Sequence, residues 1–199
     1  MSWDDKWKDV IFSDEKRFCL DGPDGHSYYF HDIRKEELNS FNRQMGGGGV
    51  MCWGAFGYNK KSDLVLIDGR IDSKKYTNML EERFLPFAVQ MANENWIFQQ
   101  DNCSVHVSKF AHKWFLDHAV TLLDWPSCSP DLNPMENMWG NLSRIVYQHG
   151  KQYNTVDQLK SAILESWEKI TTDECRKLIN SMQNRIFELI LKKGGHTSY

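Results

Sequence analysis

The amino-acid sequence predicts an α/β fold, in which a mixed five-stranded sheet is flanked by helices and further helices follow at the C-terminal end. Two observations carry this prediction. Short runs rich in β-branched and aromatic residues recur through the first two thirds of the chain, as is typical of strands. Apolar residues at helical spacing lie between these runs and after the last of them.

The predicted strands are short, and polar or turn-forming residues separate them. They are residues 9–14, 17–20, 28–31, 50–56, 63–67, 96–100 and 120–124. Two helices are predicted between strands from apolar positions three or four residues apart. Their apolar positions are Tyr76, Leu80, Phe84 and Phe87 in the first, and Val107, Phe110, Trp114 and Phe115 in the second.

Two further helices are predicted beyond residue 150, each opened by a capping box. Thr155 and Gln158 begin the first, and Thr171 and Glu174 begin the second. The core positions are Leu159, Ile163, Ser166 and Trp167 in the first helix, and Leu178, Met182, Ile186, Phe187 and Ile190 in the second. The complete order is three early strands, a helix, a fourth strand, a helix, a fifth strand and then helices. This is the order of a ribonuclease H-like fold.

The length of 199 residues, 41% of them hydrophobic, suits one well-filled domain better than two. We expect one domain over residues 1–199, with a core at about 8–150 and a helical extension at 151–199. Neither an apolar run of roughly 20 residues nor a signal-peptide region is present, so we expect an intracellular protein without a membrane partner. The five scattered cysteines lack a Cys-x-x-Cys pair, which indicates reduced thiols rather than disulfides or a zinc knuckle.

The formal net charge is −3. It argues mildly against a nonspecific DNA coat, since such a protein needs a large basic surface. A metal-dependent site is itself acidic before ions bind, so this charge leaves room for an enzyme acting on nucleic acid.

Three acidic residues stand in similar settings. Asp14 ends the apolar run 10–14, Asp101 ends the run 96–101, and Glu136 lies in the proline-rich segment 129–137. Two strands side by side that each end in an aspartate bring two carboxylates together at the rim of a sheet. Carboxylate oxygens suit Mg²⁺ or Mn²⁺, and a pair of such ions stabilises both the attacking and the leaving oxygen of a phosphodiester. The pattern therefore points to phosphoryl chemistry on nucleic acid.

The segments around these residues resemble a known family. IFSDEKRF, QQDNCSVH and WPSCSPDLNPMENMWG are similar to the three catalytic boxes of the Tc/mariner superfamily of DDE transposases, in its Tc branch. The 34 residues between Asp101 and Glu136 match the spacing of that branch, whose third ligand is glutamate. LDGPDG at 20–25, GGGGVMCWGAF at 46–56 and the helical tail extend the similarity over nearly the whole chain.

The resemblance implies a DNA transposase catalytic domain with the ribonuclease H-like fold. Asp14, Asp101 and Glu136 would hold two Mg²⁺ ions, for which Mn²⁺ can substitute. One ion would activate water for strand cleavage at a transposon end, and later the freed 3′-hydroxyl for transfer into target DNA. The other would stabilise the leaving 3′-oxygen. The resemblance also implies a TA target, action in the nucleus and a homodimer contact through the loop 21–45.

Each carboxylate also has a simpler structural interpretation. Asn133 and Pro134 look like the N-cap and first residue of a helix, so the side chain of Glu136 can reach back to the backbone amide of the cap. Asp14 can pair with a neighbouring basic residue, Lys16 or Arg17. Asp101 can simply lead into a helix. The family spacing and the matching strand ends favour the metal site over these interpretations.

Further polar residues in the same boxes are candidates for contacting DNA or positioning the metal site. They are Lys16, Asn102, His106, Ser129 and Asn133. His106 resembles the histidine of the family's second box, although a lone histidine is more often a hydrogen-bonded structural residue. The family usually has a basic residue near Cys128, and this sequence predicts that its phosphate contact is missing.

Members of this family carry two helix-turn-helix modules ahead of the catalytic domain. This chain begins 13 residues before Asp14, so we expect the region that recognises transposon ends to be absent. The alternative function is therefore a truncated or domesticated remnant, acting as a non-catalytic nucleic-acid-binding or protein-interaction module. The presence of all three carboxylates favours the enzyme.

Overall fold

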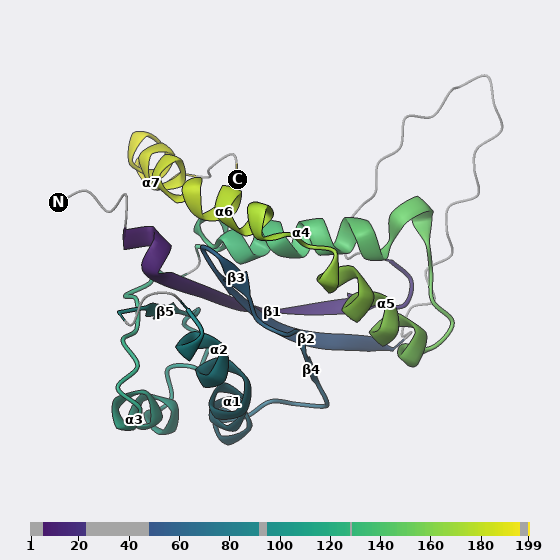
Figure 1. The fold of residues 1–199 in the computed structure, drawn as a ribbon, viewed down its shortest axis with the longest axis horizontal. Helices are drawn as coiled ribbons and strands as arrows, with labels where there is room; N and C mark the ends of the chain where they lie inside the picture. The colour runs from purple at the N-terminus through teal and green to yellow at the C-terminus, as the bar shows by residue number, and fades with distance from the viewer. Residues whose placement is uncertain (1–5, 23–47, 92–94, 128, 196–198) are drawn as a thin grey trace.

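The computed structural model describes residues 6–22, 48–91, 95–127, 129–195 and 199. Its five strands form one sheet in the order β3-β2-β1-β5, and β4 also pairs with β2 (Figure 1). β1 is antiparallel to β2 and parallel to β5, so the sheet is mixed as predicted. The strand bounds are Val10–Cys19 for β1, Gly49–Gly57 for β2, Lys60–Lys61 for β3, Val65–Ile67 for β4 and Ile97–Gln99 for β5.

The strands differ from the sequence prediction in three places. The predicted strands 9–14 and 17–20 are one continuous strand, β1. The segment 120–124 forms only an isolated parallel bridge between Leu122 and Phe98, beside β5, which is itself only three residues long. The predicted strand 28–31 lies outside the described residues.

Seven α-helices are described. Their bounds are Ser73–Met79 for α1, Leu85–Val89 for α2, Lys109–Asp117 for α3, Pro134–Val146 for α4, Val156–Glu168 for α5, Thr172–Asn180 for α6 and Met182–Leu191 for α7. Short 3-10 turns cover Lys6–Asp9, Pro130–Leu132 and Gln148–Gly150. Among the described helices, none combines the length and apolar character that a membrane crossing requires.

A π-helical turn over Leu80–Phe84 joins α1 to α2. The amide of Leu85 donates to the carbonyl of Leu80, five residues back. Pro86 follows at once, and its ring would meet the carbonyl four residues earlier in a regular α-helix. The wider turn accommodates this proline, and the predicted apolar positions of this helical segment are buried as expected.

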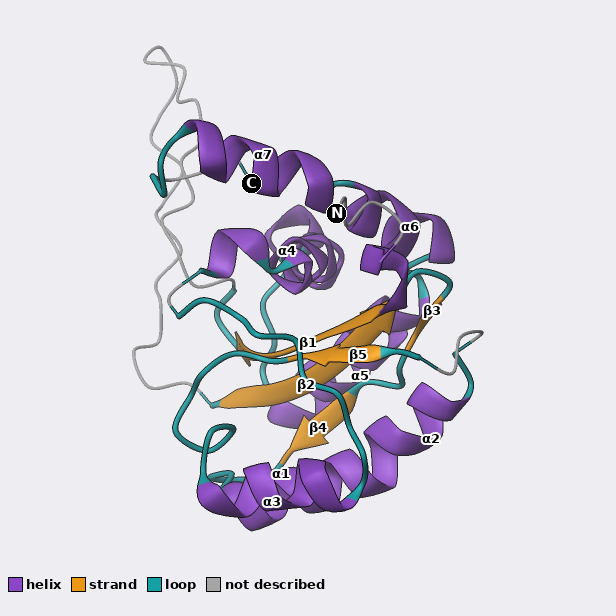
Figure 2. Cartoon of the chain, turned by 90° about the vertical axis from the view of Figure 1, so that its left-hand side faces the viewer, coloured by secondary structure: helices purple, strands orange, loops and turns teal. Residues whose placement is uncertain are grey.

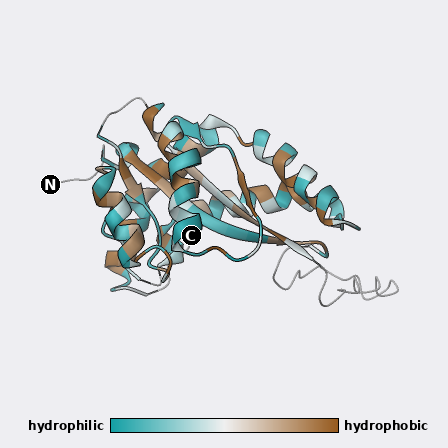
Figure 3. Cartoon of the chain, turned by 90° about the horizontal axis from the view of Figure 1, so that it is seen from below, coloured by the Kyte–Doolittle hydropathy of each residue, from teal (hydrophilic) through white to brown (hydrophobic). Residues whose placement is uncertain are grey.

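Helices cover both faces of the sheet, with α4, α6 and α7 on one side and α1, α2 and α3 on the other (Figure 2). Each face has its own hydrophobic core because successive strand residues point to opposite sides. Phe12 of β1 packs in the core beneath α4 and α5, whereas the adjacent Ile11 packs in the core beneath α1 and α3. The helices alternate hydrophobic and hydrophilic residues, as expected for elements with one buried face (Figure 3).

Four predicted core residues are exposed instead. Val107 precedes Ser108, the N-cap of α3, and Phe110 lies in the first turn of that helix with 53% of its surface exposed. Phe187 and Ile190 of α7 are 61% and 67% exposed. The apolar spacing predicted these helices correctly, but it did not show which side of each short helix faces the core.

The two C-terminal capping predictions differ in outcome. Thr171 and Glu174 form a complete capping box at the start of α6. At α5 only half of the box is present, since Thr155 accepts from the amide of Gln158 while the side chain of Gln158 accepts from Asn154 instead. The second predicted helix is also divided at Ser181 into α6 and α7.

Candidate metal centre

The parallel pairing of β1 with β5 sets Asp14 level with Asp101. The register joins residues 87 apart in sequence, Val10 with Ile97 and Phe12 with Gln99. Asp14 and Asp101 are themselves 87 apart and follow these pairs by two residues. Ser13 strengthens this end of the sheet, since its hydroxyl donates to the carbonyl of Gln99 at 2.8 Å. The two strand-end carboxylates are therefore brought together, as predicted.

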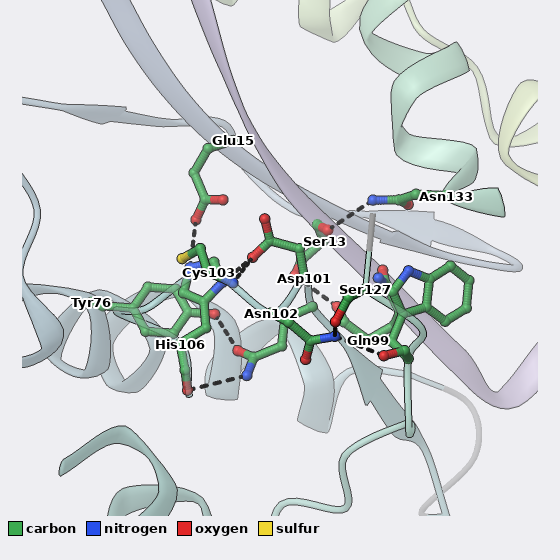
Figure 4. A network of polar contacts seen from close by, with 12 residues as sticks. Ser13, Glu15, Tyr76, Gln99, Asp101, Asn102, Cys103, His106, Ser127 and Asn133 are labelled. Atoms are coloured by element: carbon green, nitrogen blue, oxygen red, sulfur yellow. Dashed lines mark hydrogen bonds and ion pairs between the residues drawn. The ribbon is translucent and has the colours of Figure 1, made fainter. Parts of the chain in front are cut away.

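The first turn of α4 carries Glu136 to the same place. Asn133 is the N-cap, and its side-chain oxygen accepts from the amide of Met135 at 3.1 Å. Its side-chain amide also donates to the carbonyl of Ser13 at 3.4 Å, which ties the start of α4 to β1 beside Asp14 (Figure 4). The backbone amide of Asn133 donates to the carbonyl of Pro130. The capping interpretation of Glu136 is therefore wrong, and its carboxylate is exposed.

The three carboxylates line one cavity of about 330 Å³. Its complete lining is Asp14, Asp101, Asn102, Cys103, Trp125, Pro126, Ser127, Ser129, Pro130, Asn133 and Glu136. Within the described part of the chain, this lining contains three acidic side chains and no lysine, arginine or histidine. Such a cavity attracts cations, and its hard oxygen donors are those that Mg²⁺ and Mn²⁺ prefer.

Asp14 is the most perturbed of the three carboxyl groups. Burial, followed by repulsion from Glu15 and Glu136, raises its pKa to about 7. One of its oxygens accepts from the indole Nε1 of Trp139 at 3.0 Å, so the predicted pairing with Lys16 or Arg17 is replaced by a bond from α4. A bound cation would offset the same burial and repulsion that raise this pKa.

Gly54 makes room for the tryptophan that holds Asp14. It is the partner of Asp14 in the antiparallel pairing of β1 with β2. A Cβ atom on Gly54 would lie 3.1 Å from the ring of Trp139 and 3.3 Å from that of Trp167. The strand can therefore approach these two indoles closely only because this residue has no side chain.

Asp101 is held by the loop that follows β5. Its Oδ1 accepts from the amide of Cys103 at 3.0 Å and lies 2.6 Å from Nδ1 of His106. The hydrogen bond from His106 is the main reason that the pKa of Asp101 is lowered. The interpretation of Asp101 as a plain helix-entry residue is wrong, because α3 begins only at Lys109.

His106 lies between two carboxylates, one on β1 and one in the loop after β5. Its Nδ1 faces Asp101, and its Nε2 lies 3.3 Å from Oε1 of Glu15, which points to the opposite face of β1 from Asp14. Burial alone would lower the pKa of His106, but the hydrogen bonds to Asp101, Cys103 and Glu15 raise it. His106 is 4% exposed, and its role in positioning DNA or the metal site stays a prediction.

A second set of contacts holds His106 on the side of Tyr76. The ring of Tyr76 lies 4.2 Å from the imidazole, measured between centroids. The hydroxyl of Tyr76 donates to Gln100 at 2.7 Å, and the amide of Gln100 donates to the carbonyl of His106 at 3.5 Å (Figure 4). These contacts link the Asp101 loop to α1.

The other predicted polar candidates occupy distinct positions. Asn102 lines the cavity and donates to the carbonyl of Trp125 at 2.7 Å, which joins the Asp101 loop to the segment before Glu136. Ser129 also lines the cavity. Lys16 shares a strand face with Asp14 but lies outside the cavity lining. Cys128, near which a basic residue was expected, falls outside the described residues.

Sequence reasoning missed three residues of this centre: Glu15, Cys103 and Trp139. Glu15 had a usable signal, because the residue after Asp14 in a strand must face the other side of the sheet. Trp139 stands three residues after Glu136, so both share one face of α4. The position of Cys103 depends on an irregular loop, for which the sequence holds no periodic signal.

Comparison with known proteins agrees with this geometry. The family model of the DDE superfamily endonucleases matches residues 9–160. The Tc3 transposase of Caenorhabditis elegans is 44% identical over 193 residues, which cover 97% of this chain and 59% of the relative. The Tc1 transposase of the same nematode is 34% identical over 197 residues, which cover 98% of this chain and 71% of the relative. The chain thus spans about three fifths of the Tc3 transposase.

Solved structures of the Mos1 transposase have the same fold. Its paired-end complex with the left transposon end superposes with a TM-score of 0.82 at 15% identity, over 96% of this chain and 56% of that one. The Mos1 catalytic domain with Raltegravir and Mg superposes with a TM-score of 0.73 at 14% identity, over 96% of this chain and 87% of that one. The predicted ribonuclease H-like fold is confirmed. The chain belongs to the DDE superfamily endonucleases, within the Tc/mariner group of DDE transposases.

Proposed function

We propose that this chain is a transposase catalytic domain that performs metal-dependent phosphoryl transfer on DNA, with Asp14, Asp101 and Glu136 as the metal ligands. The observation that carries the proposal is the convergence of these three carboxylates on one cavity. They come from β1, from the end of β5 and from the start of α4. Acidic groups brought together from three separate elements repel one another, and a bound cation would compensate this repulsion.

The donor set fits two Mg²⁺ ions, with Mn²⁺ as a substitute. All three side chains offer hard oxygen donors, and the raised pKa of Asp14 marks a position where positive charge is favourable. Two bound ions would supply activation of the attacking oxygen and stabilisation of the leaving 3′-oxygen.

The protein's own residues hold these ligands in place before DNA arrives. Trp139 donates to Asp14, and the Cys103 amide and His106 hold Asp101. Asn133 fixes the helix turn that carries Glu136. Ligands that are held by their neighbours lose little freedom when the substrate binds, which is how preorganised sites favour reaction.

The substrates we propose are a transposon end, for strand cleavage, and a target duplex, for strand transfer. The Mos1 structures, which include a paired-end complex with a transposon end and a strand transfer complex, support this assignment through the shared fold. We propose that this activity takes place in the nucleus, where a chromosomal target duplex would lie. The homodimer contact through residues 21–45 stays a prediction, since almost all of that loop lies outside the described residues.

Calorimetric titration of Mn²⁺ into the full chain tests the metal site. We expect the wild-type chain to bind Mn²⁺ and Asp101→Asn to lose most of the binding heat, because the variant removes a ligand charge. Glu82→Gln is the matched control, since Glu82 is an exposed helical carboxylate outside the cavity. Equal binding by wild type and Asp101→Asn would refute the ligand assignment. A wild-type chain that binds DNA but no Mn²⁺ would support the non-catalytic alternative.

A further inference from the structure

We propose that Asp101, Cys103 and His106 form a second kind of metal site, one that takes a thiophilic divalent ion such as Zn²⁺. Their potential donor atoms, a carboxylate oxygen, a thiol sulfur and an imidazole nitrogen, all lie within 4.8 Å of one another. This is the donor combination that soft and borderline metals select, whereas Mg²⁺ and Mn²⁺ favour oxygen alone.

The three side chains are placed to close around one ion. Asp101 and Cys103 are exposed at the cavity, and His106 is buried behind them. The usual zinc bond lengths put neighbouring donors of a tetrahedral site about 3.3 to 3.7 Å apart. Zinc binding would therefore require the two exposed side chains to adjust, while the ring of His106 packs against that of Tyr76. The fourth position would face the cavity, where water or a substrate oxygen can enter.

Glu15 provides an independent reason to assign His106 as a ligand. A metal-binding histidine usually donates its other ring N–H to a carboxylate, which fixes the tautomer and the ring orientation. Oε1 of Glu15 lies 3.3 Å from Nε2 of His106, so Nδ1 is the nitrogen left to face the ion. That nitrogen is also the one beside Asp101.

When zinc binds at this site, its ligands release protons. The thiol of Cys103 loses its proton to become a thiolate, and the proton between His106 and Asp101 leaves for solvent. Nε2–H of His106 remains, 3.3 Å from Oε1 of Glu15. No oxidation or reduction takes place.

The site would compete with the metal centre described above because both use Asp101. This consequence rests on the proposed function. A zinc ion held by Asp101, Cys103 and His106 would withdraw that carboxylate from the Mg²⁺ site, so the chain would be inhibited by Zn²⁺ at concentrations that leave an all-oxygen centre unaffected.

Spectroscopic titration with Co²⁺, without DNA, tests the site directly. Cobalt bound to a thiolate gives a sulfur-to-metal charge-transfer absorption in the near ultraviolet. We expect this absorption with the wild-type chain, its loss in Cys103→Ser, and its bleaching by one equivalent of Zn²⁺. Cys19→Ser is the matched control and should keep the absorption, because Cys19 lies outside the cluster.

Glu15→Gln tests the role of the second carboxylate. We expect this variant to keep the charge-transfer absorption but to bind Zn²⁺ about 10- to 100-fold more weakly, as is typical when the hydrogen-bond partner of a ligating histidine is changed. Absence of the absorption in wild type, or its persistence in Cys103→Ser, would overturn the proposal.

Zinc inhibition separates this inference from the proposed function. If the chain nicks DNA with Mn²⁺, Zn²⁺ should slow the wild type more than Cys103→Ser, each measured against its own zinc-free rate. Equal inhibition would refute the competition. A chain that binds Co²⁺ through Cys103 but never cleaves DNA would keep the thiophilic site and contradict the proposed function instead.

Discussion

Asp14 shows how a site can be built at the expense of the stability of the metal-free protein. Its carboxyl group is buried next to Glu15 and within the field of Glu136, and these surroundings raise its pKa to about 7. The hydrogen bonds from the backbone of Glu15 and from Trp139 do not offset this cost. Functional sites often carry such unfavourable charges, and removal of the charge then stabilises the fold.

Asp14→Asn should therefore stabilise the metal-free chain in a pH-dependent way. The folded-state pKa of about 7 lies above the ordinary value of 3.8, so Asp14 reduces stability progressively as pH rises between these values. The gain in unfolding free energy of the variant should grow over that range and level off above it. Denaturant unfolding in EDTA at several pH values measures this gain. A gain that does not change with pH, or a loss at pH 8, would contradict the assigned burial of the charge.

We expect Asn133 to have a structural role and Glu136 a functional one. Asn133→Ala removes the N-cap of α4 and should cost about 0.5 to 2 kcal/mol of stability. Glu136→Gln should change stability little, since the side chain is exposed and does not cap the helix. Urea unfolding of both variants in EDTA compares them. A loss of stability in Glu136→Gln as large as that in Asn133→Ala would show that Glu136 also has a structural role.

At the scale of elements, α7 supports the turn that carries Glu136. Arg185 of α7 is 1% exposed and donates to the carbonyl of Asp131 at 2.9 Å and to the side-chain oxygen of Asn137 at 2.6 Å. These two acceptors lie on either side of Glu136 in the chain. The C-terminal helix thus fixes the entrance to α4, and burial lowers the pKa of this arginine.

Arg185→Met should destabilise the chain and weaken metal binding together. It removes the donors to Asp131 and Asn137, and an unsatisfied buried polar group costs about 1 to 3 kcal/mol. Unfolding and Mn²⁺ calorimetry measure the two effects. Arg176→Met is the control, because Arg176 makes only surface contacts and should change stability by less than about 0.5 kcal/mol. A normal Mn²⁺ affinity in Arg185→Met would show that α7 does not position Glu136.

The elements that the sequence predicted well are those with a complete periodic signal. β2 and the helices capped by Thr155 and Thr171 were found because strand-forming composition, helical spacing and caps are local properties. The division of the tail at Ser181 was missed, since the apolar spacing continues from Leu178 to Met182 across it. Buried Arg185 was missed for a related reason: its partners lie in a distant turn, and sequence alone does not show which carbonyl an arginine will meet.

At the scale of the whole molecule, the site depends on contacts between distant segments. The ends of two strands and the family spacing predicted that Asp14 and Asp101 lie close together. The parallel pairing that joins residues 87 apart in sequence appears only in the folded sheet. Trp139 and His106 act on these carboxylates across the sheet and through a loop. The sequence predicted the three carboxylates as ligands, and the folded chain shows which residues hold them.

The proposed DNA cleavage, with metal ions held by the three carboxylates, is tested most directly by nicking of supercoiled plasmid DNA. The full chain, Asp101→Asn, Glu136→Gln and the control Glu82→Gln are compared with Mn²⁺ and with EDTA. We expect the wild type and Glu82→Gln to nick DNA only with Mn²⁺, and both cavity variants to be inactive while still folded. Nicking that persists in EDTA, or at the wild-type rate in Glu136→Gln, would contradict a metal centre made by Asp14, Asp101 and Glu136.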